Sequence, residues 1–90
     1  MPRVERTFLI VNMLGLHARA AAQLVQSANR FTCSVNVEKD GIEVNGKSIM
    51  GVLTLAAAKG TEIVVRCEGD DAEAAMASLA TMIQNGFGEK

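Results

Sequence analysis

Two short segments of alternating apolar and polar residues flank the dipeptide Asp40-Gly41, and this arrangement constrains the fold more than any other feature of the sequence. Within residues 32–39 the apolar Cys33, Val35 and Val37 alternate with polar side chains, and the alternation resumes in residues 42–45. Such alternation is typical of strands with one buried face. An Asp-Gly pair readily adopts the two positive φ angles of a type I′ turn, so these residues predict an antiparallel hairpin.

Two further segments have the pattern of strands, and two have the pattern of longer helices. Residues 6–11 form a β-branched and aromatic run with Phe8 and Ile10 on one face, and in residues 61–68 the apolar Ile63, Val65 and Cys67 occupy alternate positions. In residues 18–29, apolar side chains recur three and four positions apart, which places them on one stripe of a helix. A second helix of this kind is expected near the C-terminus, capped by Asp70 or Asp71.

Ser48 is expected to begin a short third helix. A serine at the N-cap can accept a hydrogen bond from a backbone N–H of the first turn. We expect this helix to run from Ile49 to about Ala57. Lys59 and Gly60 would close it, since basic residues and a C′ glycine are both favoured at helix ends.

The order of the elements is strand, helix, strand, strand, helix, strand, helix. Each strand has one apolar face and each helix one apolar stripe, so the economical arrangement has two layers. We therefore predict an α+β fold in which a four-stranded, mainly antiparallel sheet carries three helices on one face. With 90 residues the chain is long enough for one small domain, expected to span residues 1–90. It has three Phe and no Trp or Tyr, so the core must be mainly aliphatic.

Composition excludes several classes of function. Nine basic and ten acidic residues give a net charge of −1, which argues against binding to nucleic acid through a basic surface. No apolar run is long enough to span a membrane, and residues 1–6 lack the apolar core of a signal peptide, so we expect a cytoplasmic protein. Cys33 and Cys67 are far apart and the chain has one His. We therefore expect no metal site, no cofactor and two reduced, buried thiols.

The residues that most suggest chemistry lie at the start of the helix over residues 18–29. His17 directly precedes this helix, Gly15 allows a close turn before it, and Arg19 falls in its first turn. A helix N-terminus and a guanidinium group both favour an anion, so an imidazole beside them could accept a phosphoryl group. The residues leave three roles open for His17: phosphoryl acceptor, general base and helix cap. A general base would need a partner nucleophile and an orienting carboxylate, and the sequence pattern reveals neither.

Ser48 could have a second role beyond capping. A phosphate on an N-cap serine would lie at the positive end of the helix dipole and need not unfold the helix. Ile49 and Met50 follow directly, and at least one of them is expected to face outward. A small apolar docking patch is predicted from five residues: Leu16, Ala18, Ala22, Ile49 and Met50.

Two segments resemble the signatures of a known family. Residues 15–19, Gly-Leu-His-Ala-Arg, resemble the active-site signature of HPr, the histidine phosphocarrier of the bacterial phosphoenolpyruvate-dependent sugar phosphotransferase system. Residues 45–52, Asn-Gly-Lys-Ser-Ile-Met-Gly-Val, resemble its serine-site signature. The two occur in the family's order and at its separation, and the resemblance covers almost the whole chain. It implies an open-faced β-sandwich of βαββαβα order.

The resemblance also implies a function. Enzyme I, charged from phosphoenolpyruvate, would phosphorylate His17 on Nδ1, and His17 would pass the phosphoryl group to an Enzyme IIA protein. Arg19 would have the family's arginine role of stabilising the phosphate. Ser48 would be the site of an ATP-dependent HPr kinase/phosphorylase and would control docking to partners, a transcriptional regulator among them. Such a protein is a monomeric, stoichiometric phosphoryl-transfer intermediate and not a turnover enzyme.

The sequence departs from the commonest family pattern in two places. Ala20 stands where many members have Pro, and Ala also enters a helix easily. Gln26, Asn29 and Gly51 occupy a region where many members carry lysines, so the docking surface is expected to be less basic. Sugar uptake and a dedicated regulatory phosphorelay both remain open. Two other functions also remain open: a binding module controlled through Ser48, and a scaffold without phosphorylation.

Overall fold

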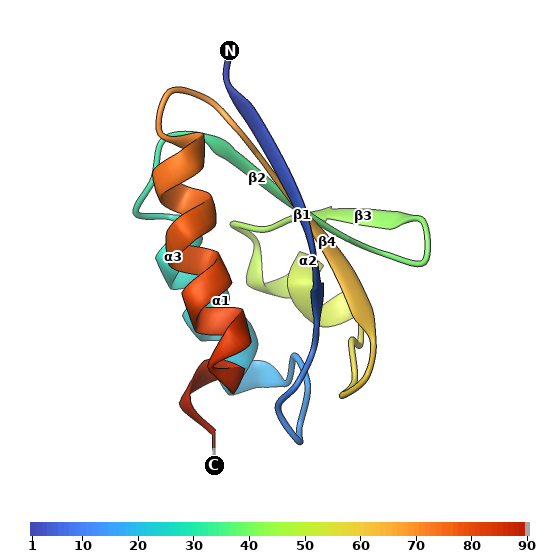
Figure 1. The fold of residues 1–90 in the computed structure, drawn as a ribbon. Coiled ribbons are helices and arrows are strands. Elements are labelled where there is room, and N and C mark those ends of the chain that lie inside the picture. The colour runs from blue at the N-terminus through green and yellow to red at the C-terminus, as the bar shows by residue number, and fades with distance from the viewer. Residues whose placement is uncertain (90) are drawn as a thin grey trace.

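The computed structural model describes residues 1–89, and their elements follow the predicted βαββαβα order (Figure 1). The strands and helices are β1 (Arg3–Leu9), α1 (Ala18–Ala28), β2 (Ser34–Lys39), β3 (Ile42–Asn45), α2 (Ile49–Thr54), β4 (Glu62–Glu68) and α3 (Ala72–Gln84), followed by a short 3₁₀ turn at Gly86–Gly88. No helix within residues 1–89 is long and apolar enough to cross a membrane.

The four strands form one open sheet in the order β1-β4-β2-β3, and every neighbouring pair is antiparallel. The hairpin between β2 and β3 confirms the prediction made from its turn, because φ is 52° at Asp40 and 83° at Gly41. α3 packs across β1 and β4, while α1 packs between α2 and α3 (Figure 1). The α+β prediction is therefore confirmed.

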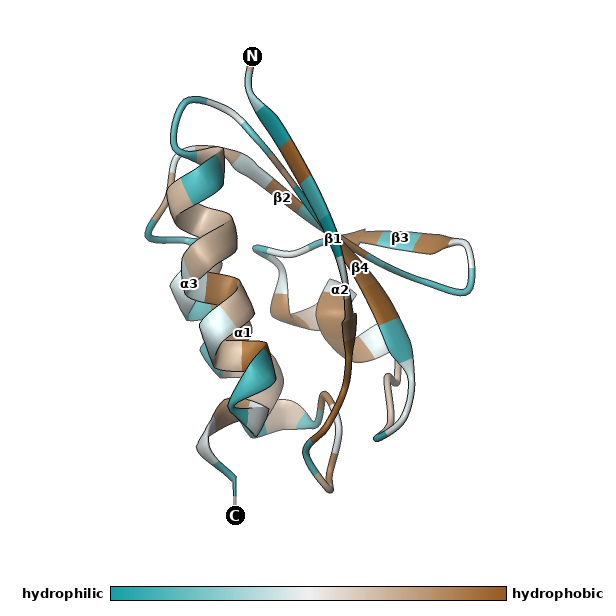
Figure 2. Cartoon of the chain, viewed as in Figure 1, coloured by the Kyte–Doolittle hydropathy of each residue, from teal (hydrophilic) through white to brown (hydrophobic). Residues whose placement is uncertain are grey.

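The core lies between the sheet and the helices and is almost entirely aliphatic. Figure 2 shows the alternation of hydrophobic and hydrophilic residues along the strands that places one face of the sheet against this core. Its largest fully buried side chains include Ile10, Leu24, Ile63, Leu79 and Ile83.

Both cysteines are reduced and buried, as the alternation of β2 and β4 predicts. Burial raises the pKa of the Cys67 thiol to about 11, and it also raises the pKa of the Cys33 thiol above 9.0. Neither thiol is therefore a thiolate at neutral pH. Within residues 1–89 no group of three or more metal-binding side chains comes together.

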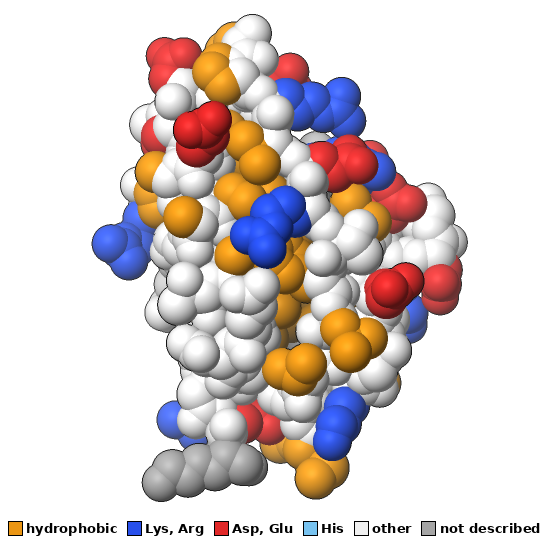
Figure 3. All heavy atoms as spheres, in the orientation of Figure 1, with side chains coloured by type: hydrophobic (Ala, Val, Ile, Leu, Met, Phe, Trp, Pro, Cys, Tyr) orange, Lys and Arg blue, Asp and Glu red, His pale blue; other side chains and the backbone are white. Residues whose placement is uncertain are grey.

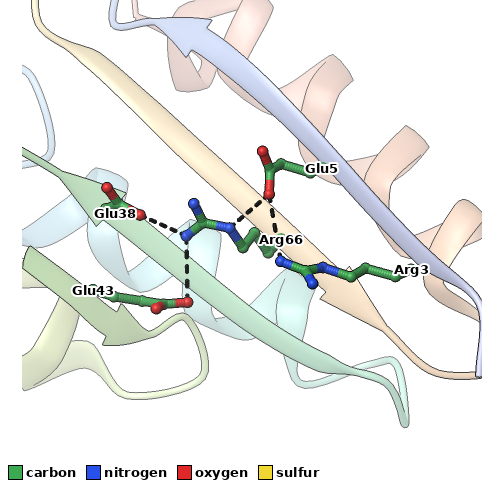
Figure 4. A network of polar contacts seen from close by, with 5 residues as sticks. All are labelled: Arg3, Glu5, Glu38, Glu43 and Arg66. Atoms are coloured by element: carbon green, nitrogen blue, oxygen red, sulfur yellow. Dashed lines mark hydrogen bonds and ion pairs between the residues drawn. The ribbon is translucent and has the colours of Figure 1, made fainter. Parts of the chain in front are cut away.

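The open face of the sheet carries an ion-pair network centred on Arg66 of β4 (Figure 4). Its Nε donates to Glu5 of β1 at 2.7 Å, and its Nη1 donates to Glu38 of β2 at 2.6 Å. Nη1 also lies 3.4 Å from a carboxylate oxygen of Glu43 in β3. The neighbouring carboxylates raise the pKa of Arg66 above its ordinary value, chiefly through the hydrogen bond to Glu38. One guanidinium group thus links all four strands of this face.

The first strand is displaced from its predicted bounds, which were residues 6–11. β1 begins at Arg3 because its polar residues pair along the full length of β4, from Arg3 opposite Glu68 to Leu9 opposite Glu62. Ile10 lies beyond the assigned strand yet keeps two backbone hydrogen bonds, one with Thr61 and one with Gly60.

The second helix is shorter than expected and ends at Thr54 instead of continuing to Ala57. Ala56 has a positive φ of 48°, which no helix residue adopts. The Nζ of Lys39 donates to the carbonyl oxygens of Leu55 and Ala56, at 3.0 and 3.3 Å. A cation from β2 therefore satisfies the end of α2 well before Gly60 is reached.

Asp71 occupies the N-cap position of α3, but its side chain does not cap the helix. Its carboxylate accepts instead from the backbone N–H groups of Thr32 and Cys33, each at 2.8 Å. The bond from Thr32 is the largest of several that lower the pKa of Asp71 below 3.8. Because these two N–H groups are occupied, β2 begins at Ser34 and not at the expected Thr32.

Candidate functional site

His17 is the N-cap residue of α1, with an extended backbone at φ −72° and ψ 178°. Its carbonyl oxygen accepts the first intrahelical bond from the N–H of Ala21, at 2.8 Å, and its side chain makes no capping hydrogen bond. The N–H groups of the first turn therefore have no intrahelical acceptor. Since the first turn contains no acidic residue, the positive end of the helix dipole is available to an anion.

Gly15 fixes how the chain enters this helix. Its φ is 65°, and a Cβ at this position would collide with the carbonyl oxygen of Ala57. The next residue, Leu16, donates its N–H to the same oxygen at 2.8 Å. The close turn predicted at Gly15 is therefore present, and it binds the loop before α1 to the segment after α2.

A carboxylate from the far end of the chain reaches the imidazole. Oε2 of Glu89 lies 2.7 Å from Nε2 of His17. Two donors hold the carboxylate: Nδ2 of Asn12 at 2.9 Å from Oε2, and the backbone N–H of Leu14 at 3.4 Å from Oε1. Nδ2 of Asn12 also donates to the carbonyl oxygen of Gly15 at 2.7 Å. Figure 1 shows the C-terminal end of the chain near the start of α1, at the same end of the molecule as this loop.

The contact between His17 and Glu89 is half-buried, since the two side chains are 27% and 22% exposed. The hydrogen bond from Asn12 is the largest of the effects that lower the pKa of Glu89 below 4.5, and the bond to His17 acts in the same direction. Glu89 is therefore ionised at neutral pH. Sequence reasoning missed both Glu89 and Asn12, because a contact between residues 72 positions apart leaves no local pattern.

Arg19 lies in the first turn of α1 and is exposed. Its guanidinium group makes no hydrogen bond or ion pair with any other side chain of residues 1–89, unlike that of Arg66. This cation is two residues from His17 in the sequence, and no other side chain of residues 1–89 holds it elsewhere.

The five residues of the expected docking patch do not share one environment. Leu16 is 4% exposed and belongs to the core, so it is not available to a partner. Ala18 is exposed and Ala22 half-buried, while Ile49 and Met50 are 39% and 69% exposed. The residues of the predicted patch that solvent reaches are therefore Ala18 and Ala22 near the start of α1, and Ile49 and Met50 at the start of α2.

The loop before α1 adds exposed apolar side chains that sequence reasoning missed. Met13 and Leu14 are 71% and 65% exposed. Figure 3 shows hydrophobic side chains at the lower end of the visible face, where Figure 1 places this loop.

Ser48 is the N-cap of α2, as predicted, and its Oγ accepts from the N–H of Gly51 at 3.2 Å. α1 and α2 run in opposite directions, because Leu16 contacts Ala57 while the side chain of Asn29 donates to the carbonyl oxygen of Lys47 at 3.2 Å. At about 1.5 Å per residue, the length of α1 separates its two ends by about 18 Å. Ser48 therefore lies at the opposite end of the helix pair from the imidazole.

Comparisons with known proteins agree with this architecture. A family described as "PTS HPr component phosphorylation site" matches residues 4–85. The phosphocarrier protein HPr of Xylella fastidiosa is 46% identical over 86 residues, which cover 96% of this chain and 97% of that protein. The HPr-like protein Crh of Bacillus subtilis is 51% identical over 70 residues, covering 78% of this chain and 82% of Crh.

A solved structure has the same fold throughout. The crystal structure of HPr-C-His from Thermoanaerobacter tengcongensis superposes with a TM-score of 0.94 at 45% identity, covering 97% of this chain and 98% of that one. By sequence and by fold, the chain belongs to the HPr family, the phosphocarrier proteins of the phosphotransferase system.

Proposed function

We propose that this protein carries a phosphoryl group on Nδ1 of His17, accepts it from phospho-Enzyme I and passes it to Enzyme IIA proteins. One observation carries the proposal: His17 stands at the open N-terminus of α1 with Nε2 engaged by Glu89, which leaves Nδ1 as the ring nitrogen for attack. The free N–H groups of the first turn would receive the phosphate oxygens. Arg19 would supply a charge-assisted hydrogen bond to the same phosphate.

On this proposal the chain is a stoichiometric intermediate and not a turnover enzyme. It would act as a cytoplasmic monomer in which residues 1–90 form a single domain. Neither proposed step requires a cofactor, because the imidazole itself is the nucleophile and the phosphohistidine is the donor in the second step.

Labelling tests the proposal. The protein is incubated with Enzyme I and phosphoenolpyruvate carrying ³²P, in parallel with His17→Ala. We expect an acid-labile, base-stable phosphate on the wild type and none on the variant. Absence of labelling by active Enzyme I, or equal labelling of His17→Ala, would contradict the proposed carrier function.

Ser48 is proposed as a regulatory site for an HPr kinase/phosphorylase. The distance of about 18 Å between the ends of α1 exceeds the Debye length of about 8 Å in physiological salt, so a phosphate on Ser48 would act weakly on the His17 ring itself. It would act on partners, because the exposed Ile49 and Met50 follow it directly.

This regulatory proposal predicts that Ser48→Asp weakens binding to Enzyme I, while the ¹⁵N chemical shifts of the His17 ring stay those of the wild type. Ser48→Thr serves as the control, since threonine keeps the capping hydroxyl without adding charge. Unchanged affinity of Ser48→Asp for Enzyme I, Enzyme IIA and a transcriptional regulator alike would contradict it.

A further inference from the structure

We propose that Glu89 is a positioning residue for phosphoryl transfer, which holds the proton of His17 on Nε2 and thereby presents the lone pair of Nδ1 to the incoming phosphorus. The inference rests on the proposed carrier function of His17. It also supplies the orienting carboxylate that the sequence pattern does not reveal.

The hydrogen-bond inventory determines the direction of the contact. An ionised carboxylate has no proton to donate and can only accept. With Nε2 and Oε2 2.7 Å apart, the proton of a neutral imidazole must therefore lie on Nε2, and Nδ1 must carry the lone pair. Carboxylates that accept from one ring nitrogen fix the tautomer and the ring orientation of functional histidines in the same way.

The carboxylate is itself held in place. Asn12 donates one amide hydrogen to Glu89 and the other to the carbonyl oxygen of Gly15, so both hydrogens of its Nδ2 are directed at acceptors. Asn12 is only 4% exposed, and its Oδ1 has no hydrogen-bond partner within residues 1–89. A buried side chain with an unpaired acceptor lowers stability. Its two donors instead order the loop before α1 and the carboxylate that contacts the imidazole.

The contact also suits the product of the reaction. The lone pair of Nδ1 forms the new N–P bond while the bond between phosphorus and the donor breaks, and its electron pair leaves with the donor. No proton needs to leave Nε2, so the phosphorylated ring is a cation whose N–H still faces Glu89. The two ring nitrogens point in diverging directions, so the carboxylate pairs with the ring's positive charge without occupying the place of the phosphate. When the phosphoryl group leaves again, the ring returns directly to its neutral Nε2–H form.

Two readouts test the role. Protein labelled with ¹⁵N-histidine reports the tautomer by NMR at a pH where the ring is neutral, and steady-state kinetics of Enzyme I with this protein as the phosphoryl acceptor separate kcat from KM. In the wild type we expect a protonated Nε2 and an unprotonated Nδ1. In Glu89→Ala we expect a mixture of tautomers and a fall in kcat of about tenfold, with KM unchanged.

Two further variants sharpen the test. Glu89→Gln keeps an oxygen acceptor without the charge, so its kcat should fall between those of the wild type and Glu89→Ala. Glu68→Ala removes an exposed carboxylate at the end of β4 and should match the wild type in both readouts. Thermal unfolding of each variant shows whether the fold is retained.

The inference is wrong if Glu89→Ala keeps the wild-type ring shifts and a kcat within twofold of the wild type. It is equally wrong if Glu89→Ala transfers faster, since the carboxylate would then be competing with the phosphate. Both results require that the wild type is phosphorylated on His17. A wild type that accepts no phosphate would contradict the proposed function instead.

Discussion

The backbone N–H of Leu16 donates a 2.8 Å hydrogen bond to the carbonyl oxygen of Ala57. This bond joins the loop before α1 to the segment after α2, at the base of the helix that presents His17. It forms only because Gly15 has a positive φ of 65° and no side chain to collide with that oxygen. The position of the imidazole therefore depends on a glycine two residues before it.

Gly15→Ala should destabilise the protein by more than a backbone penalty alone. A positive φ in the left-handed region costs an L-residue about 1–2 kcal/mol. Gly60→Ala is the matched control, since Gly60 also has a positive φ of 87° but a Cβ there would meet nothing within 4 Å. Urea unfolding should show a larger loss for Gly15→Ala than for Gly60→Ala. Equal losses would mean that the close approach to Ala57 is unimportant.

Arg19→Ala should slow phosphoryl transfer without weakening the fold. A hydrogen bond to a charged group contributes about 1.5–3 kcal/mol, so its loss from the transition state corresponds to a fall of about 10- to 100-fold in kcat/KM. Arg19 has no side-chain partner within residues 1–89, so the midpoint of thermal unfolding should not change. Arg30→Ala removes another exposed cation, beyond the opposite end of α1, and should leave transfer nearly unchanged. Equal kinetics for the two variants would argue against a phosphate contact by Arg19.

Asp71 should make the loop before β2 sensitive to acid. Its pKa lies below 3.8, chiefly because the N–H of Thr32 donates to it, so the ionised form is the one that the fold stabilises. The ionised carboxylate of Asp71 therefore stabilises the fold above pH 3.8. This stabilisation is lost as the pH falls through the lowered pKa of Asp71 in the folded protein. The amide protons of Thr32 and Cys33, followed by NMR, should titrate with a midpoint below 3.8. This transition should be absent in Asp71→Asn, and a midpoint at or above 3.8 would contradict the assignment.

Ser48→Ala should lower stability through loss of the cap of α2. Oγ of Ser48 accepts from the N–H of Gly51, and removal of an N-cap acceptor costs about 1 kcal/mol. Ser48→Thr should retain most of that stability. Chemical denaturation measures both variants, and a Ser48→Ala protein as stable as the wild type would show that the cap contributes nothing.

The sequence predicted helices and strands well where apolar residues recur at the regular spacing of a strand or of a helix. The alternation around Asp40 and Gly41 predicted the β2–β3 hairpin, and the apolar stripe of α1 predicted that helix to within one residue. The failures have a common cause in tertiary contacts. α2 ends early because Lys39 reaches its last carbonyl groups, and β2 starts late because Asp71 takes two of its N–H groups.

The residues of the candidate site also divide into those with a local sequence signal and those that only the fold brings together. His17, Arg19 and Ser48 could be selected from the sequence, because helix starts and short motifs are local features. Glu89 and Asn12 could not, since nothing near either residue signals a contact with His17. Leu16 is expected in the docking patch from the sequence, whereas its side chain belongs to the core.

The most direct test of the account is the identity of the phosphorylated atom. Protein labelled with ¹⁵N-histidine is phosphorylated with Enzyme I and phosphoenolpyruvate, and NMR then detects which ring nitrogen couples to phosphorus. Because Nε2 of His17 is engaged by Glu89, the account predicts coupling to Nδ1 of His17. A phosphate on Nε2, or on any other residue, would contradict it.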